Sequence, residues 1–321
     1  MGKQSFKNLL ESKTIKEIDS IINEFTILNN DEVSYKNLKK EDKIDLFLKN
    51  IRVYLDSFVK ELTKEEYKSL KKILKIKIFK SSLLEMNELS LFSLLLKYNL
   101  GYKKIKSSGE FYYIYSDIKK ELVKSVNKNN YKVIVNWNDK LSFIKGIINV
   151  FGIVKTEELI NIFNKNYNIE KEELLVKLKK QSIIHEDYKL DTYKEQDYIY
   201  SGSFTSFRQA QKFIFEKDLD QYGYLVYIDY GNRVYKYNKE YKKLIKFIKH
   251  KYVFKKNDLK KFEGLVLNKY VDLYRINKVS ALKFLKENIK VRFEYKNKEL
   301  ENKLLEQIEL VAQNEPKWVI K

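Results

Sequence analysis

One order of elements, helices followed by a two-stranded hairpin, can be read twice in this sequence, and it constrains the fold more than any other feature. The first occurrence spans 59–130. Thr63-Lys-Glu-Glu66 has the pattern of a capping box, which predicts the start of a helix. Ser107-Ser-Gly109 has the composition of a hairpin turn. The other elements expected here are a helix at 88–98, strands at 102–106 and 110–115, and a helix from Asp117, its cap, to about 126.

The second occurrence spans 131–201. Asp139 is expected to cap a helix that extends to 150, and Thr156 to cap the next helix, because both side chains can accept a hydrogen bond from a free backbone N–H. The remaining elements are expected to be helices at 157–166 and 170–181, a turn at 191–196, and strands at 182–190 and 197–200.

Both ends of the chain are expected to be mainly helical. In the N-terminal module, 1–58, Thr14 and Glu17 match a second capping box, and a further helix is expected at 40–54. In 202–321, an alternating segment at 222–237 predicts a hairpin. A bundle of helices is expected to follow, at 240–252, 259–274, 279–288 and 298–313. The predicted fold class is therefore mainly α with small β-hairpins (α+β).

The order helix, helix–turn–helix, hairpin resembles that of winged helix–turn–helix domains, so the resemblance implies tandem winged-helix units. The closing sequence Asn314-Glu-Pro-Lys-Trp318-Val-Ile-Lys321 is similar to the end of a largely uncharacterised group of low-GC bacterial winged-helix proteins with a Rho-like N-terminal segment. Such domains place their second helix in the major groove of DNA. For this chain that implies DNA contacts by Lys171, Lys177 and Lys180, and backbone contacts by Lys189 and Lys194 of the wing.

The segment LLESKTIKEIDSIINEFTI…SYKNLKKEDKIDLFLKNI resembles the helix–loop–helix modules of the Rho N-terminal and SAP type. Those modules bind nucleic acid through the loop and the start of the second helix. The alternative is a helical hairpin that only packs. The positions that the resemblance assigns to binding are Tyr35, Lys36, Lys39, Lys40 and Lys43.

A third resemblance lies in Val226-Tyr-Ile-Asp-Tyr-Gly-Asn232, which is similar to the core of Tudor domains, whose aromatic cages bind methylated residues. The alternative is an ordinary hairpin. Tyrosines are also concentrated in this part of the chain, where they either form core or stack on the bases of a single strand. They are Tyr188, Tyr193, Tyr198, Tyr200, Tyr222, Tyr224, Tyr227 and Tyr230.

Positive charge is the main indication of function. The chain has 64 Lys and Arg against 44 Asp and Glu, a net charge of +20, which attracts polyanions. Almost all of it is lysine, which suits phosphate contact better than base reading. The alternative is the lysine-rich composition of an AT-biased genome. The helix at 240–252 has a cationic face of Lys242, Lys243, Lys246, Lys249 and His250, of which Lys242, Lys246 and Lys249 are candidate phosphate contacts.

Signatures of enzymes are missing from the sequence. With no cysteine and two histidines, Cys-ligated metals, thiol nucleophiles and three-His sites are excluded, and no Walker, Gly-x-Gly-x-x-Gly or Gly-x-Ser-x-Gly motif is present. Asp272 with Glu294 and Lys296 mimics a nuclease constellation, but about nine such acid-x-basic triples are expected from composition alone. We therefore expect neither catalysis nor a cofactor.

The expected function is non-enzymatic nucleic-acid binding, with duplex DNA favoured, by a regulator or a mobile-element or phage protein. Glu170, Glu172 and Glu173 at the start of the presumed reading helix oppose DNA contact, so a scaffold or inhibitor that binds an acidic or nucleic-acid-loaded protein is one alternative. A binder of single-stranded RNA or DNA is another. No apolar run reaches the ~18–20 residues that span a bilayer and no secretory signal is evident, so we expect a cytoplasmic protein without a membrane partner.

Overall fold

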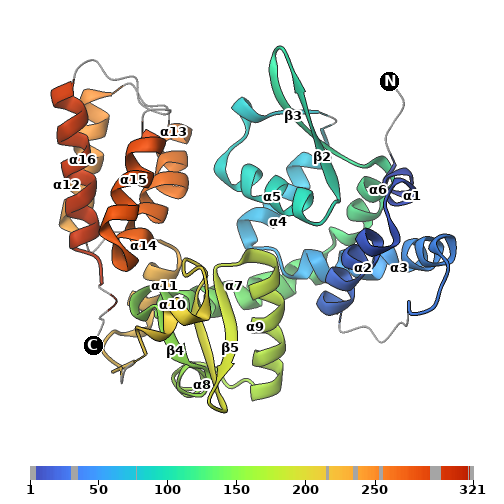
Figure 1. Ribbon diagram of the computed structural model, residues 1–321, viewed down its shortest axis with the longest axis horizontal. Helices are drawn as coiled ribbons and strands as arrows, with labels where there is room; N and C mark the ends of the chain where they lie inside the picture. The colour runs from blue at the N-terminus through green and yellow to red at the C-terminus, as the bar shows by residue number, and fades with distance from the viewer. Residues whose placement is uncertain are drawn as a thin grey trace. The chain divides into compact units, whose positions relative to one another are not determined.

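The computed structural model describes residues 5–29, 35–76, 78–214, 217–233, 238–252, 256–289, 298–316 and 318. Within these ranges the chain is mainly helical with two small antiparallel sheets of three strands each (Figure 1), which confirms the expected α+β class. The chain divides into two compact units, 1–138 and 139–321, and each is described by itself.

The first unit begins with three helices, α1 (Phe6–Ser12), α2 (Ile15–Asn29) and α3 (Lys40–Lys60). The expected capping box of α2 is confirmed. The Glu17 carboxylate accepts a hydrogen bond from the Thr14 N–H at 2.8 Å, and the Thr14 hydroxyl oxygen accepts one from the Glu17 N–H at 3.3 Å. The helices enclose a core of stacked and tilted rings that includes Phe6, Phe25, Phe47 and Tyr54.

The first sheet follows these helices in the chain. The sheet consists of β1 (Phe79–Lys80), β2 (Gly101–Lys106) and β3 (Gly109–Ile114). Helix α4 (Lys64–Ile73) precedes β1, and a 3-10 turn (Ser81–Leu83) and α5 (Met86–Lys97) lie between β1 and β2. The strand order is β1-β3-β2. The capping box at Thr63 and the hairpin turn at 107–108 are confirmed. The hairpin of β2 and β3 projects from the helices of its unit (Figure 1).

Two predicted helix caps are wrong. Helix α6 (Ser116–Ser125) begins after Tyr115, and the Asp117 carboxylate instead accepts a hydrogen bond from the Phe6 N–H at 2.8 Å, which caps α1. The Asp117 carboxylate thus caps a helix that is distant in the sequence, whereas the local pattern predicts that it caps its own helix. Asp139 lies inside α7 (Lys128–Phe151), which no glycine or proline interrupts where the cap was expected, so the helix starts earlier in the chain.

The second unit holds the second sheet. The sheet is formed by β4 (Ile153–Lys155), β5 (Tyr188–Tyr193) and β6 (Gln196–Ser201), and helices α8 (Thr156–Asn164) and α9 (Lys171–His185) lie between β4 and β5 in the chain. The strand order β4-β6-β5 repeats that of the first sheet. Thr156 is the first residue of α8 and Lys155 is its cap, so the predicted cap is off by one residue. The strand predicted from 182 is wrong at 182–185, because α9 ends only where Glu186 adopts a left-handed φ of 54°.

The hairpin predicted at 222–237 is also wrong, because Tyr224–Gly231 forms helix α11, after the short α10 (Phe207–Gln211). The Tudor resemblance therefore fails, since its core is helical, and 234–237 lie outside the described residues. Packing explains the difference. Helix α11 crosses α7 so closely that a Cβ at Gly146 would overlap the Tyr227 carbonyl oxygen, and the Tyr227 ring is buried edge-on to Phe143.

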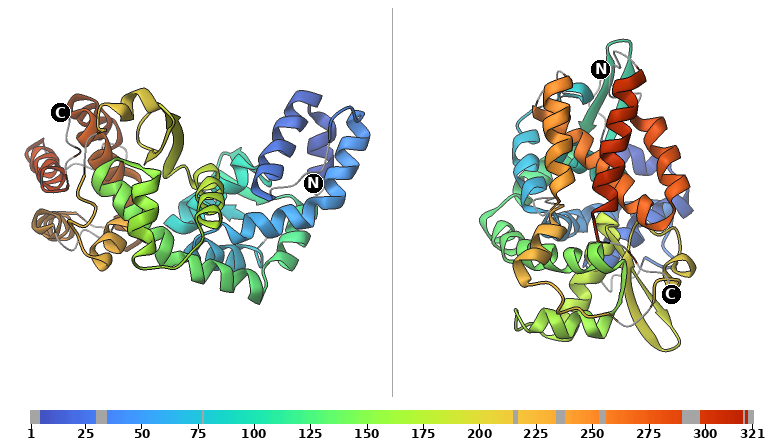
Figure 2. Two further views of the ribbon diagram at one scale, coloured as in Figure 1. Left: turned by 90° about the horizontal axis from the view of Figure 1, so that it is seen from below. Right: turned by 90° about the vertical axis from the view of Figure 1, so that its left-hand side faces the viewer.

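The end of the second unit is a helical bundle, as expected. It comprises α12 (Lys239–Lys251), α13 (Lys256–Phe262), a π-helical turn (Glu263–Leu267), α14 (Asn268–Ile276), α15 (Lys278–Ile289) and α16 (Lys298–Gln313). Figure 2 shows α12 and α16 side by side, and their inner faces share an apolar core with α14 and α15. Leu244, Ile248, Leu304 and Ile308 contribute to that core.

Candidate nucleic-acid interface

The N-terminal candidates do not form one exposed cluster. Lys36 and Lys39 are exposed, whereas Lys40 donates a hydrogen bond to the Glu11 carbonyl oxygen at 2.6 Å. Lys43 is buried and forms an ion pair of 2.6 Å with Asp19, so it is not available for the contact predicted for it. Tyr35 is buried as well, with its hydroxyl 2.6 Å from that of Tyr54. Two of the four predicted lysines thus hold the module together.

Helix α9 presents a mixed surface. Lys171 is exposed and Lys180 is half-buried, but only 6% of Lys177 is exposed, so the expected DNA contact by Lys177 is not supported. The cause is helical geometry, because position 177 lies on the same face as Leu174 and Leu178, which are both buried. Glu172 and Glu173 are exposed at the start of the helix, where they would repel phosphate.

The second hairpin is tied to its own unit. The ammonium of Lys189 donates a hydrogen bond to the Phe204 carbonyl oxygen at 2.9 Å. Lys194 is exposed at the turn, where it and Glu195 have positive φ and its ammonium lies 5.3 Å from the centre of the Tyr193 ring. Four of the eight clustered tyrosines are core, Tyr188, Tyr198, Tyr200 and Tyr227, whereas Tyr193 is exposed and the other three are half-buried.

The predicted cationic face of α12 is present at the surface. Lys242, Lys246 and Lys249 are exposed at helical spacing, and His250 is exposed next to them. Lys243 is also exposed, but it forms an ion pair of 2.7 Å with Glu240. The opposite face, with Leu244 and Ile248, is buried in the bundle, which fixes the direction in which the lysines point.

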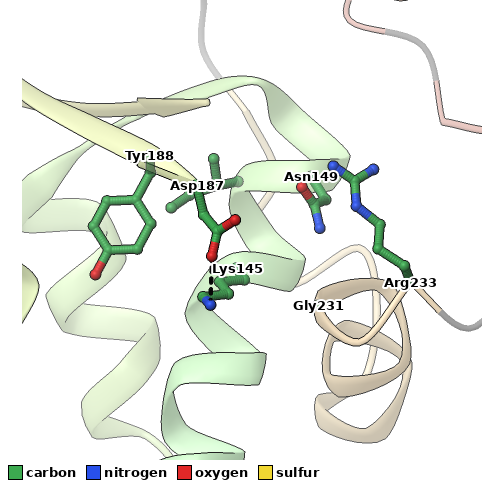
Figure 3. A pocket seen from close by; sticks show the side chains of 7 residues that line it. Lys145, Asn149, Asp187, Tyr188, Gly231 and Arg233 are labelled. Atoms are coloured by element: carbon green, nitrogen blue, oxygen red, sulfur yellow. Dashed lines mark ion pairs between the residues drawn. The ribbon is translucent and has the colours of Figure 1, made fainter. Parts of the chain in front are cut away.

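The second unit also contains a cavity of about 110 Å³ between α7, the start of β5 and the end of α11 (Figure 3). Its lining includes three charged side chains, Lys145, Asp187 and Arg233. Lys145 forms an ion pair of 2.5 Å with Asp187, and Arg233 donates two hydrogen bonds to Asp272 at 2.9 and 2.7 Å. Both cations therefore already have a carboxylate partner, which weakens the case for an anionic ligand.

The electrostatics of Asp187 support this interpretation. Loss of water around the carboxyl favours its neutral form, but the ion pair and hydrogen bond with Lys145, together with electrostatic interactions with His185 and Arg233, outweigh that effect and hold the pKa of Asp187 below its ordinary value. The carboxylate thus stays charged and keeps its partner Lys145 at neutral pH. We therefore regard the cavity as part of the polar core of the unit.

Among the residues that the structure describes, no group of three or more His, Asp or Glu side chains could hold a metal ion. Asp272 of the nuclease constellation lies on α14, while Glu294 and Lys296 lie outside the described residues. His185 belongs to the last turn of α9 and not to a strand, and His250 is on the surface, as expected.

One basic region of the structure is not among the binding sites predicted from the sequence. In the first sheet Lys80 lies opposite Phe111, and the ammonium groups of Lys104 and Lys106 lie over the rings of Tyr102 and Phe111. Two signals could have found it. One is the recurrence of Tyr102, Lys104 and Lys106 at every second position, with aromatic residues in the following strand, and the other is the short turn that sets the register of the two strands.

Comparisons with family models, with curated proteins and with solved structures gave no match to this chain. In the described part of the chain, none of the helices combines the length and the apolar character needed to cross a bilayer.

Proposed function

We propose that the protein binds nucleic acid without catalysing a reaction, with duplex DNA as its main partner. Tandem winged-helix units provide the scaffold in this proposal. Lysines contact the phosphate backbone, and few side chains read bases. The biological setting that we favour is a regulator or a protein of a mobile element or phage.

The scaffold is supported by the order of elements around the two sheets. In each case a helix, a strand and a further helical segment precede a hairpin, and the first strand pairs with the last. Winged helix–turn–helix domains have this order, with the helix before the hairpin in the major groove. In the second unit that helix is α9, where Lys171 is the exposed candidate, and Lys194 lies at the tip of the wing.

The exposed face of α12 is the observation that carries the proposal. Lys242, Lys246 and Lys249 point to solvent from one side of a helix whose other side is fixed in the bundle. A row of ammonium groups on a rigid helix matches the repeated charges of a phosphate backbone. Lysine gives little base discrimination, so the expected binding is strong at low salt and weakly dependent on sequence.

A salt titration tests the proposal. The affinity of the full chain for a random duplex is measured by fluorescence anisotropy from about 50 to about 200 mM salt, over which six phosphate contacts lose ~10³-fold in affinity. Lys242→Gln, Lys246→Gln and Lys249→Gln are combined in one variant. We expect its affinity to fall at least about tenfold at low salt and its log–log salt slope to become shallower by about 2 to 3.

A matched control removes three lysines of the same bundle that are held by carboxylates. Lys243 pairs with Glu240, and the other two, Lys278 and Lys303, form ion pairs with glutamates of α16. Their combined change to Gln alters the net charge equally and is expected to have a smaller effect. Equal effects would contradict a specific role for the α12 face, and absence of any duplex or single-strand binding by the wild type would refute the proposal.

A protein-binding role for α9 is the second candidate, and the exposed Glu172 and Glu173 favour it. If α9 faces DNA, changing both residues to Gln removes repulsion and should strengthen duplex binding. If α9 instead faces a protein partner, duplex affinity should stay the same. The anisotropy measurement distinguishes the two orientations of the helix.

A further inference from the structure

We propose that one face of the first sheet is a binding site for a single-stranded segment of nucleic acid, with unpaired bases on its aromatic rings and phosphates at its lysines. This inference rests on the proposed nucleic-acid binding and adds a second site, separate from the α12 face. We call the surface the aromatic face. Its members are Lys80, Tyr102, Lys104, Lys106, Phe111 and Tyr113.

The register of the strands places these residues on one side. Directly opposed residues of antiparallel strands point to the same face, and every second residue along a strand returns to it. Tyr102 opposes Tyr113, and Phe111 of the central strand opposes both Lys104 and Lys80. Lys106 opposes Gly109 at the turn, on the same side.

The other face of the sheet is directed toward α5. Phe79 and Tyr112 oppose each other there, and both rings contact Phe92 of α5 with centroids 5.1 Å away. Since that face packs on a helix of its own unit, the aromatic face points away from α5. Its rings are half-buried and therefore partly accessible, and Lys106 is exposed.

The rings of the aromatic face are ordered by their neighbours. Tyr102 and Tyr113 are stacked, with centroids 4.9 Å apart and planes 6° from parallel, and Tyr102 also contacts the buried Tyr115 at its base. A preformed stack loses little freedom when a base is added to it. Aromatic platforms of this kind bind bases of any sequence, because every base has a π-face.

The lysines lie over these rings. The Lys104 ammonium is 5.4 and 5.9 Å from the centres of Tyr102 and Tyr113, and that of Lys106 is 5.2 Å from the centre of Phe111. The Lys80 chain extends toward the turn, since its Cε would be 3.3 Å from a Cβ at Gly109. A phosphate can approach Lys104 and Lys106 without first breaking a salt bridge across the strands.

Charge complementarity identifies the occupant as an anion. Glu110 is the sole carboxylate among the residues of these three strands, all of which the structure describes, and it lies on the opposite face with Lys103, 3.0 Å away. The aromatic face therefore carries three positive charges and no negative one. A duplex hides the faces of its bases, so rings and lysines together fit a single strand, whereas an acidic peptide would use the lysines alone.

The test uses the full chain with a fluorescent oligothymidine and, in parallel, the same strand paired with its complement. Tyr113→Ala is compared with Tyr113→Phe, which keeps the ring. Loss of stacking is expected to weaken single-strand binding about 5- to 100-fold for Tyr113→Ala and less than twofold for Tyr113→Phe, with duplex affinity unchanged. Circular dichroism checks that both variants are folded.

Two adjacent lysines provide a second, independent comparison. Lys104→Gln changes the aromatic face and Lys103→Gln the opposite one, with the same loss of charge. Only Lys104→Gln is expected to weaken oligothymidine binding, by about threefold or more, and to flatten its salt dependence by about 0.7, the slope of one phosphate contact on a single strand.

The outcomes separate the two proposals. If the protein binds duplex but neither Tyr113→Ala nor Lys104→Gln changes its affinity for the single strand, only the proposal for the aromatic face is wrong. Failure to bind either nucleic acid overturns both proposals. Polyglutamate that displaces the oligothymidine equally well from the wild type and Tyr113→Ala also overturns the inference, because the rings would then have no part in recognition.

Discussion

Arg233 donates both of its terminal N–H groups to the carboxylate of Asp272, at 2.9 and 2.7 Å. Asp272 is 7% exposed and also lies 3.6 Å from Arg275, whose side chain is buried and donates to the Asn149 carbonyl oxygen at 2.8 Å. The Trp318 indole N–H donates to the same carbonyl oxygen at 3.2 Å. One polar network thus connects α7, α14 and the end of the described chain within the second unit.

Asp272→Asn is expected to destabilise the protein strongly. The change leaves the charge of two arginines without this partner, and removal of one member of a buried pair costs about 3 to 5 kcal/mol. Urea unfolding measures the free energy of unfolding. Asp220→Asn is the control, because its ion pair with Lys165 is exposed and is expected to contribute at most about 1 kcal/mol. Similar decreases in the free energy of unfolding of the two variants would contradict the role of the network.

Gly152→Ala is expected to destabilise the second unit. Gly152 has a φ of +77°, and a Cβ there would lie 2.7 Å from the Trp318 ring, so both strain and overlap oppose a side chain. We expect a loss of about 1 to 3 kcal/mol. Gly223→Ala is the matched control, since nothing lies within 4 Å of its Cβ position. Thermal unfolding that ranks Gly223→Ala as the more damaging change would reject this explanation.

Lys217 is expected to make stability depend on pH. Burial lowers its pKa to about 7, although the Glu158 carboxylate acts in the opposite direction, while an unfolded chain has a lysine pKa of ~10.5. Between these two pH values the unfolded state binds more protons than the folded state. The unfavourable contribution of Lys217 to the free energy of folding is therefore largest below pH ~7 and disappears as pH rises toward ~10.5. Lys217→Met should therefore be most stabilising, relative to the wild type, at low pH. A difference in the free energy of unfolding between Lys217→Met and the wild type that stays constant from pH ~6 to ~10 would disprove this prediction.

Lys177 and Lys171 lie on the same helix and should differ in their effect on duplex binding. Lys177 is buried against the core of its unit, so Lys177→Gln is expected to lower stability and leave the affinity of the folded protein within about twofold. Lys171 is exposed at the helix start, and Lys171→Gln should weaken binding and flatten the salt slope by about 0.9 if α9 faces DNA. Anisotropy at two salt concentrations gives the duplex affinity and the salt slope of each variant. A larger loss of affinity for Lys177→Gln than for Lys171→Gln would contradict the burial argument.

The elements with strong local signals could be predicted from the sequence. The capping boxes at Thr14 and Thr63, the first hairpin turn and the helix Lys298–Gln313 were predicted where they lie. Each depends on hydrogen bonds or apolar spacing within a few residues. The cap assigned to Asp139 is wrong because α7 starts earlier in the chain, and the cap assigned to Asp117 is wrong because of a long-range contact. An acid near a helix start is bound by whichever free N–H groups the fold brings to it, and for Asp117 these belong to Phe6.

The sequence by itself determined the repeated order of helices and hairpin in 59–201, since that pattern comes from short-range geometry, and it determined the net positive charge through the excess of lysine over acid. Tertiary structure alone decided which lysines face water. Lys43 and Lys177 are buried, while Lys104 reaches the surface next to two stacked rings. Tertiary structure also decided that Tyr224–Gly231 is helical, through its close packing on Gly146. The physical reason is that exposure depends on contacts between segments far apart in the chain, which a local pattern does not encode.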